Sequence, residues 1–201
     1  MWRAATQGFS GRMPCGLSAM NIREYLHKMR GTTRGSPPRV SKQEILWSWI
    51  GAFLGIGSLA WVNQLFFAGD DLPLLLGSFG ASAVLVYGAS RSPLAQPRNL
   101  VGGHFLSAVV GVLCWKLLHP YPWLAQAAAV ATAIAVMHAT RTLHPPGGAT
   151  ALIAVIGSPA IHEQGFWFVL MPATLGPLIL LAVAVLVNNV PVSRRYPEIW
   201  F

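Results

Sequence analysis

The sequence predicts an all-α polytopic membrane protein with about six membrane crossings, from its apolar runs and from the charges of the loops between them. Of the 201 residues, 54% are hydrophobic and only 10% are charged, whereas soluble domains have roughly 25% charged residues. So few charged side chains cannot cover a surface exposed to water. The charges also lie almost entirely outside the apolar runs, as expected for helices that cross a bilayer.

Four apolar runs have the length of a membrane-spanning helix, about 20 residues. They are Ile45–Phe67, Leu100–Leu118, Trp123–Thr140 and Phe166–Val187. Two further apolar stretches are less regular: Leu72–Gly88 is interrupted by Pro73, Gly77 and Gly80, and Gly147–Gly157 has only eleven residues. Apolar segments of about 10 to 14 residues are usually core or re-entrant pieces. We therefore expect at least one of the two to be only partly helical.

The loop charges predict the orientation, because Lys and Arg concentrate on the cytoplasmic side of a membrane. The basic N-terminal tail is expected inside, and the later loops on that side contain Arg91, Arg98, Arg141, Arg194 and Arg195. The loops on the opposite side contain Asp70, Asp71 and Glu163. Both termini are therefore expected inside, which requires an even number of crossings.

Three regions are predicted: a basic cytoplasmic N-terminal tail over residues 1–43, a transmembrane domain over 44–190 and a short cytoplasmic C-terminal tail over 191–201. Residues Asn21 to Arg30 are expected to form a short basic amphipathic helix. The net charge of +8 belongs mostly to the N-terminal tail and favours an anchor beside anionic lipid over a nucleic-acid partner. The predicted location is the cell's inner membrane, with an organellar membrane as the alternative if this tail is a transit peptide.

Membrane helices pack through small residues, because lipid provides no hydrophobic drive between them. Small residues recur at four-residue spacing in three runs, as Gly51 and Gly55, as Gly103, Ser107 and Gly111, and as Ala127, Ala131 and Ala135. This spacing predicts a compact bundle rather than a wide pore. It leaves open whether copies of the chain associate into a homo-oligomer.

An internal repeat is indicated by Gly80–Leu85, which recurs as Gly148–Ile153 at an offset of 68 residues. Each copy runs on to a Ser-Pro pair. The offset divides the membrane domain into two three-helix units, and units with an odd number of crossings lie in opposite orientations. Chance similarity between two helices rich in small residues is the alternative.

The repeat predicts that each unit's second element is an extended segment followed by a short broken helix. Two helix amino ends would then face each other at Gly80–Ser82 and Gly148–Thr150, and the unpaired N–H groups of such ends bind anions. We expect Pro145 and Pro146 to be non-helical, with the helix resuming at the two glycines that follow. A turn at the inner surface is the alternative.

No Asp or Glu lies inside an apolar run, which argues against a sodium site or a proton-carboxylate site. The polar groups available there are hydrogen-bond donors, which suit a small anion. The predicted substrate-binding residues are Gly80, Ser82, His104, His144, Gly147, Gly148 and Thr150, and the predicted entrance residues are Gln96, Arg98, Asn99 and Arg141. The alternatives are structural hydrogen bonds for the histidines, an inner-surface anchor for Arg141 and helix capping for the cluster at Gln96.

Four blocks of the sequence carry a resemblance to a known family. They are Gly77–Ala81, Leu94–Asn99, Gly102–His104 and Leu143–Ala151. In this order they resemble the HPP family of integral membrane proteins, which is named for the motif that stands here as His144-Pro145-Pro146. The resemblance implies an all-helical membrane domain, and plant and cyanobacterial relatives are associated with nitrite transport.

We therefore expect a transporter or channel for a small inorganic anion, with a nitrite-like oxyanion favoured through the resemblance alone. A non-transporting membrane scaffold or assembly subunit is the alternative. An enzyme is not expected, because no serine, cysteine or carboxylate has a base and an orienting partner at a recognisable spacing. No cofactor, metal site or disulfide is expected either, since the two cysteines lie far apart and no metal-ligand cluster stands in the sequence. The expected partners are the lipid bilayer and the anion.

Overall fold

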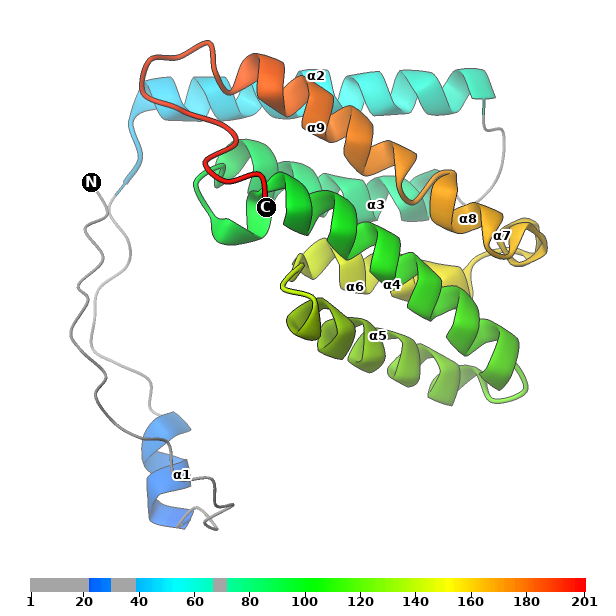
Figure 1. The fold of residues 1–201 in the computed structure, drawn as a ribbon. Coiled ribbons are helices and arrows are strands. Elements are labelled where there is room, and N and C mark those ends of the chain that lie inside the picture. The colour runs from blue at the N-terminus through cyan, green and yellow to red at the C-terminus, as the bar shows by residue number, and fades with distance from the viewer. Residues whose placement is uncertain (1–21, 30–38, 67–71) are drawn as a thin grey trace. The chain divides into compact units, whose positions relative to one another are not determined.

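The computed structural model describes residues 22–29, 39–66 and 72–201. Contacts within the chain divide it into two units, Met1–Arg39 and Val40–Phe201. In the first unit, helix α1 spans Ile22–Met29 (Figure 1), which confirms the short helix expected around these residues. The acidic loop residues Asp70 and Asp71 lie outside the described residues.

The regular structure of the second unit is entirely helical, and the described residues contain no β-strand. Its α-helices are α2 (Lys42–Phe66), α3 (Leu72–Ala83), α4 (Pro97–Leu118), α5 (Pro122–Ala139), α6 (Pro145–Ile156), α7 (Pro159–Gln164), α8 (Trp167–Leu170) and α9 (Leu175–Val187). A π-helical turn, η1 (Val84–Gly88), follows α3, and a 3₁₀ turn, η2 (Pro93–Ala95), precedes α4. The predicted all-α fold class is confirmed.

Among the described residues, four helical stretches are long and apolar enough to cross a membrane, namely Lys42–Val62, Pro97–Leu118, Pro122–Ala139 and Trp167–Val187. Two shorter apolar helices, Gly77–Gly88 and Pro145–Ile156, accompany them. These elements coincide with the four long runs and the two less regular stretches that the sequence indicates.

The helix of α3 is more regular than expected. It runs through Pro73, Gly77 and Gly80 and continues directly into η1, so the predicted interruption is wrong. Pro73 is the second residue of α3, where a missing N–H breaks no helical hydrogen bond. The last predicted span is less regular than expected, because residues 171–174 separate α8 from α9. Pro172 in this segment lacks the donor that a continuous helix would use.

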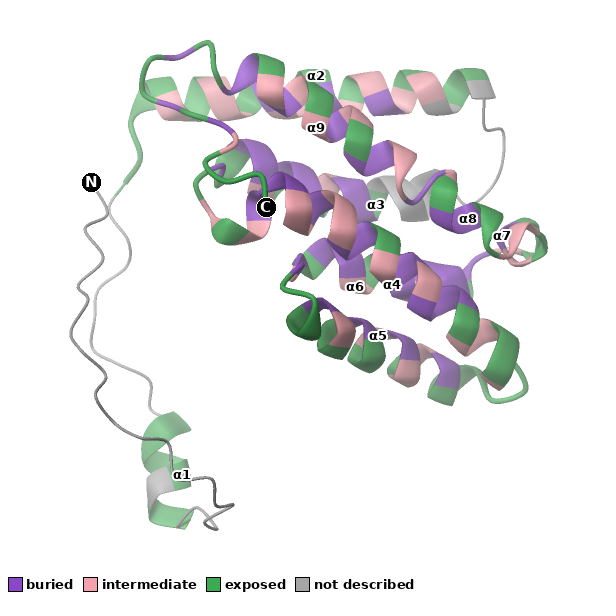
Figure 2. Ribbon diagram, viewed as in Figure 1, coloured by how far each residue is buried: buried purple, intermediate pink, exposed green. Residues whose placement is uncertain are grey.

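The outer surface of the second unit is strongly apolar. On α2, Trp49, Phe53 and Trp61 are 62%, 63% and 65% exposed. Only 17% of the spanning stretch of α2 is buried within the unit, against 44% of that of α4 (Figure 2). Leaving apolar surface in water costs about 25 cal/mol per Å², so a surface of this kind requires a bilayer. The long helices are therefore embedded in lipid, with α4 central and α2 at the edge.

α4 is the central packing element of the unit. It packs most extensively against α6 and α5, and it also contacts α8 and α9, whereas α2 lies beside α9 and η1 (Figure 1). A Cβ at Gly51 would lie 2.6 Å from Tyr87 Cδ1, and a Cβ at Gly111 would lie 2.5 Å from the Ala151 carbonyl oxygen. The small-residue contacts predicted for α2 and α4 are therefore confirmed.

α5 packs through a different face from the predicted one. Its buried alanines are Ala125, Ala129 and Ala133, whereas the predicted packing residues Ala127, Ala131 and Ala135 are exposed. The prediction for α5 is wrong because alanine occupies both faces of this helix. A four-residue spacing of small residues therefore could not identify the packed face.

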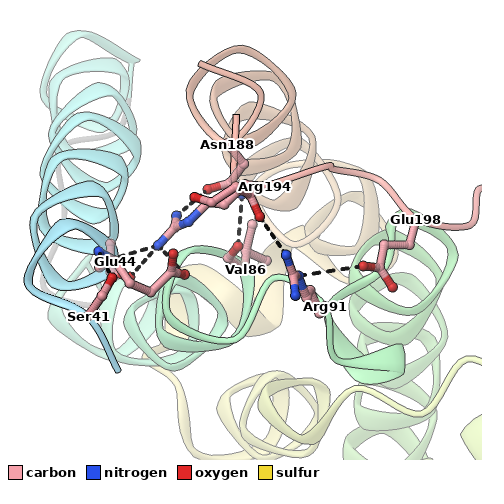
Figure 3. A network of polar contacts seen from close by, with 9 residues as sticks. Ser41, Glu44, Val86, Arg91, Asn188, Arg194 and Glu198 are labelled. Carbon is pink, nitrogen blue, oxygen red and sulfur yellow. Dashed lines mark hydrogen bonds and ion pairs between the residues drawn. The ribbon is translucent and has the colours of Figure 1, made fainter. Parts of the chain in front are cut away.

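One end of the unit is held by a buried arginine (Figure 3). The Arg194 guanidinium forms an ion pair with Glu44 Oε1 at 2.7 Å and donates to the Ser48 hydroxyl at 2.7 Å. It also donates to Asn188 Oδ1 at 2.9 Å, and the Asn188 amide donates to the Val86 carbonyl at 3.0 Å. The C-terminal end of α9 is thereby joined to the start of α2 and to η1.

Candidate functional site

The helical path is broken between α5 and α6. α5 ends at Ala139, and Arg141 takes a left-handed conformation with a φ of 57°. The Thr142 N–H then donates to the Met137 carbonyl at 2.9 Å, which satisfies the end of α5. His144 is extended, with φ −138° and ψ 104°. This linker places His144 inside the bundle at the start of α6.

The break lies earlier in the chain than the sequence predicted. Pro145 and Pro146 are the first two residues of α6, so the prediction that they are non-helical is wrong. The first turn of a helix needs no N–H donors, and the fixed φ of proline suits it. The helix therefore begins before Gly147 and Gly148. The expected extended segment before a short helix is confirmed in this half of the chain.

The two expected helix amino ends do not face each other. Gly80 and Ser82 lie within α3, which begins at Leu72, so the predicted helix start there is wrong. Glycine is tolerated inside a helix, so nothing at this point interrupts α3. At the start of α6 the prolines have no N–H, and the Gly147 N–H donates to the His144 carbonyl at 2.8 Å. These backbone positions present few free donors to an anion.

Side chains, rather than backbone ends, meet at the contact between α3, α4 and α6. The Ser82 hydroxyl oxygen lies 2.8 Å from His104 Nε2 and 2.9 Å from His144 Nε2. The other ring nitrogen of His104, Nδ1, lies 2.7 Å from Thr150 Oγ1. The Ser78 hydroxyl lies 2.9 Å from Thr150 Oγ1. We call these five residues, Ser78, Ser82, His104, His144 and Thr150, the histidine-hydroxyl network.

Helix spacing explains why these side chains converge. Ser78 and Ser82 are four residues apart on α3 and therefore share one face. Ser78 lies beside Thr150, and Ser82 lies beside His144, so α3 and α6 run antiparallel where they touch. His104 projects from α4 between them, with one ring nitrogen toward each helix.

A backbone carbonyl fixes the tautomer of His144. Its Nδ1 lies 2.8 Å from the carbonyl oxygen of Leu94 in η2. Because a carbonyl oxygen only accepts hydrogen bonds, Nδ1 must carry the hydrogen. In a neutral ring, Nε2 is then an acceptor and takes the hydrogen of the Ser82 hydroxyl. The turn η2 therefore orients the imidazole that follows the break.

The whole network is buried in an apolar part of the unit. Ser78 is 2% exposed and the other four side chains are 0% exposed. The ring of Phe79 lies 5.5 Å from that of His104, centroid to centroid. Buried polar groups need hydrogen-bond partners, and the members of the network supply them to one another. Within the described part of the chain, no three His, Cys, Asp or Glu side chains are grouped so as to hold a metal ion.

Glycines permit the close approach that brings the histidines together. A Cβ at Gly103 would lie 2.6 Å from His144 Cβ and 2.9 Å from the Thr142 carbonyl oxygen. A Cβ at Gly147 would lie 2.8 Å from Ser107 Oγ. Gly147, predicted as a substrate-binding residue, therefore stands at the tight contact between α4 and α6.

Gly80 and Gly148 are near the network in sequence but not part of it. A Cβ at Gly80 would meet nothing within 4 Å. Gly148 faces α5, where a Cβ would lie 3.8 Å from Val130 Cγ1. It helps to line an apolar groove of about 440 Å³ with Val130, Ile134, Met137, Leu143, Pro145, Ala149 and Leu152. None of the five network side chains lines this groove.

The predicted entrance residues are held by backbone groups at one end of the unit. Arg98 donates to the Thr140 carbonyl at 2.6 Å, and Asn99 donates to the Leu143 carbonyl at 2.9 Å. Both side chains thus tie the start of α4 to the linker between α5 and α6. Arg141 is exposed.

Gln96 is buried and connects two segments. Its amide nitrogen donates to the Ser90 and Ser92 carbonyls at 3.0 Å and 2.9 Å. Its amide oxygen accepts from the Glu198 N–H at 3.0 Å, so the C-terminal segment lies against this position. Gln96 makes no side-chain cap of α4, and the capping alternative is wrong for this residue.

The C-terminal segment also contacts the turn that orients His144. The Tyr196 hydroxyl donates to the Ala95 carbonyl at 2.7 Å, one residue after the carbonyl that accepts from the imidazole. Burial raises the pKa of Tyr196, so the phenol stays protonated and able to donate. Arg91 donates to the Ser193 carbonyl and lies 3.9 Å from Glu198 Oε1 (Figure 3). The segment predicted as a short tail is thus packed against η2.

Sequence reasoning missed Ser78, which completes the network. The signal was present, because Ser78 and Ser82 are four residues apart in an apolar stretch and must share a helix face. It also missed the Leu94 carbonyl, for which the sequence offers no signal, since every residue has a backbone carbonyl. The predicted Ser82, His104, His144 and Thr150 are brought together, whereas the four entrance residues lie apart from them.

Comparison with known proteins places this arrangement in a family. The transmembrane region of HPP proteins matches residues 37–197. Two transmembrane proteins of Dictyostelium discoideum are each 44% identical, over 181 and 186 residues, or 89% and 90% of this chain. The chain spans 58% and 65% of their lengths. No solved structure matches this chain. The match covers all four sequence blocks and the whole network, and the chain therefore belongs to the HPP family of transmembrane proteins.

Proposed function

We propose that this protein is a transporter or channel for a small inorganic anion, with a nitrite-like oxyanion favoured by the family resemblance. The observation that supports this function is the histidine-hydroxyl network. Five hydrogen-bonding side chains lie buried in an apolar unit, and none of them is a carboxylate. Polar groups inside a membrane are costly and usually mark a transport pathway. Hydroxyl and imidazole N–H groups can donate to an anion, and the network contains no carboxylate that would neutralise a cation.

An anion would bind by exchanging contacts within the network for contacts with itself. His104 lies between Ser82 and Thr150, with one ring nitrogen directed at each hydroxyl. A small oxyanion at this point accepts from both hydroxyls and from the imidazole. Hydrogen bonds to a charged acceptor are roughly twice as strong as those between neutral groups, which offsets the loss of the internal contacts. Arg98 and Arg141 provide positive charge at the end of the unit from which the anion would approach.

The proposed topology has six crossings with both termini in the cytoplasm. The crossings are α2, α3 with η1, α4, α5, α6, and α8 with α9. Contacts within the unit support this arrangement, because Arg194 forms an ion pair with Glu44 and Arg98 donates to the Thr140 carbonyl. Arg91, Arg98 and Arg194 thus lie toward one end of the unit, as the positive-inside rule requires.

An inverted repeat would explain why His104 is contacted by one residue from each half of the membrane domain. Ser82 and Thr150 are equivalent positions at the offset of 68 residues, and they contact the two ring nitrogens of His104. The helices that carry them are antiparallel where they touch. The two Ser-Pro pairs also have the same local form, since Ser92 accepts from the Leu94 N–H and Ser158 from the Ala160 N–H, both at 3.2 Å. Pseudo-symmetric sites between inverted units are typical of secondary transporters.

The test is anion uptake into proteoliposomes that contain the full chain. Nitrite, nitrate and chloride are compared in vesicles with protein and in empty vesicles of the same lipid. The proposal predicts protein-dependent flux of at least one of the three, with nitrite preferred to chloride. Flux of none of them would contradict it and favour the alternative, a non-transporting scaffold or assembly subunit. The proposal assigns no covalent chemistry to the network.

A further inference from the structure

We propose that the histidine-hydroxyl network binds a single proton and shares it between His104 and His144 through the Ser82 hydroxyl. This proton site rests on the proposed function only for its use in transport, because the contacts that define it lie within the protein. Its basis is the number of hydrogens that these contacts need.

The network and two backbone carbonyls form an unbroken line of contacts. In order, the contacts join the Leu94 carbonyl to His144 Nδ1 (2.8 Å), His144 Nε2 to Ser82 Oγ (2.9 Å), Ser82 Oγ to His104 Nε2 (2.8 Å), His104 Nδ1 to Thr150 Oγ1 (2.7 Å), Thr150 Oγ1 to Ser78 Oγ (2.9 Å), and Ser78 Oγ to the Pro146 carbonyl (2.9 Å). Both ends are carbonyl oxygens, which accept and never donate. Each of the six contacts therefore needs one hydrogen from inside the line.

With both rings neutral, the line is one hydrogen short. Three hydroxyls and two neutral imidazoles carry one hydrogen each, which makes five hydrogens for the six contacts. If Ser78 donates to the carbonyl and Thr150 donates to His104, two hydroxyl lone pairs face each other at 2.9 Å. A longer contact of 3.3 Å from Ser82 to the Ser78 carbonyl lies outside this line and supplies no hydrogen to it.

One added proton fills every contact, and it can reside on either ring. With the charge on His104, Nδ1–H donates to Thr150 and Nε2–H donates to Ser82, whose own hydrogen goes to His144 Nε2. Transfer then moves the Nε2 proton of His104 to the Ser82 oxygen while the Ser82 hydrogen moves to His144. The charge is now on His144, Ser82 donates back to His104, and the number of hydrogens is unchanged.

The surroundings allow one proton and disfavour two. The ring centroids of His104 and His144 are 5.1 Å apart, and two positive charges at this separation repel strongly in a medium of low dielectric constant. No Asp, Glu, Lys or Arg stands in α3, α6, α9 or η2. Elsewhere on the elements that pack against the two rings, Arg98 is bonded to a carbonyl, the Tyr87 hydroxyl donates to the Leu180 carbonyl and His138 is exposed.

The other titratable groups on the packed helices lie toward the far end of α4. Cys114 is a partly buried free thiol, Lys116 lies over the Phe166 ring, and His162 of α7 stacks on Trp115 with its Nε2 3.2 Å from a carbonyl. None of these groups hydrogen-bonds to, or stacks on, the five network residues. A proton in the network would thus be an uncompensated charge in an apolar core. A monovalent anion would neutralise it, which makes proton and anion natural co-substrates.

The test is a titration of the purified full chain in lipid nanodiscs, without any anion flux. Histidine ring nitrogens are labelled with ¹⁵N, and the spectra are followed from about pH 8 to about pH 4, across the ordinary histidine range. We expect the His104 and His144 signals to shift together toward the doubly protonated form, with one proton bound by the pair. The wild type should take up one more proton than the double variant His104→Gln/His144→Gln over this pH range.

Removing the Ser82 hydroxyl tests whether the two histidines share the proton. Ser82→Ala keeps both rings but removes the hydroxyl between them, so the proton should be confined to one ring and the two histidine signals should respond separately. Ser107→Ala, another buried serine on α4, should titrate like the wild type. Two rings that stay singly protonated throughout in the wild type would overturn the proton site, as would uptake of two protons. Because no transport is measured, failure of anion uptake leaves these outcomes unaffected.

Discussion

The tight contact at Gly103 offers a quantitative test of how the network is positioned. Gly103→Ala adds a Cβ that would lie 2.6 Å from His144 Cβ and 2.9 Å from the backbone oxygen of Thr142. Ordinary carbon contacts are about 3.5–4.0 Å, and neither neighbour is the flexible end of a side chain. The linker before α6 must therefore move by roughly an ångström, which takes His144 away from Ser82 and from the Leu94 carbonyl.

Overpacking of this kind costs typically 1–3 kcal/mol. For a domain of about 150–250 residues each kcal/mol lowers Tm by about 2–4 °C, so Gly103→Ala should lower Tm by about 2–12 °C. The assay is thermal unfolding in detergent, with monodispersity measured in parallel. Gly57→Ala is the matched control, because a Cβ there meets nothing within 4 Å, and it should be neutral or stabilising by up to about 1 kcal/mol. Equal Tm values for the two variants would refute the packing described for α4 and α6.

Three further substitutions test other parts of the structure. Arg141→Gly should raise stability by about 0.5–1 kcal/mol in thermal unfolding, because glycine relieves the left-handed φ of 57°; a less stable variant would contradict this. Ala129→Leu should destabilise the protein by about 1–3 kcal/mol and Ala131→Leu by much less, since only Ala129 is buried. Equal effects would support the α5 packing face that the sequence predicted. Arg194→Gln should cost about 3 kcal/mol because it breaks a buried ion pair, whereas the exposed Arg195→Gln should unfold like the wild type.

Much of the fold could be predicted from composition, because a membrane span is defined by length and apolar content alone. The four long spans and the two short helices were located in this way. Helix interruptions were harder to place, since the effect of a proline depends on its position in the helix. Pro73 and Pro145 both fall in first turns, where they disrupt nothing. Pro172 falls between α8 and α9 in a run that the sequence presented as continuous.

The candidate site was predicted in its residues but not in its geometry. His104, Ser82, His144 and Thr150 stood out because polar groups are rare in apolar runs. They were expected to bind an anion together with backbone N–H groups at helix amino ends. That expectation required a helix to begin near Gly80, whereas α3 begins at Leu72. Helix starts are not fixed by an apolar sequence that contains no cap. The contacts that join these four side chains bridge 22 to 62 residues of the chain, and they depend on the packing of α3, α4 and α6.

The central claim is that the histidine-hydroxyl network is the transport site, and nitrite uptake by two serine variants tests it most directly. Ser82 bridges the two imidazoles, whereas Ser107 is equally buried and its hydroxyl donates to the Met137 sulfur at 3.6 Å, outside the network. In proteoliposomes with matched amounts of monodisperse protein, Ser82→Ala should transport at least about tenfold more slowly than the wild type, the factor that 1.4 kcal/mol represents. Ser107→Ala should transport at close to the wild-type rate. A Ser82→Ala protein that carries nitrite as fast as the wild type would contradict the assignment.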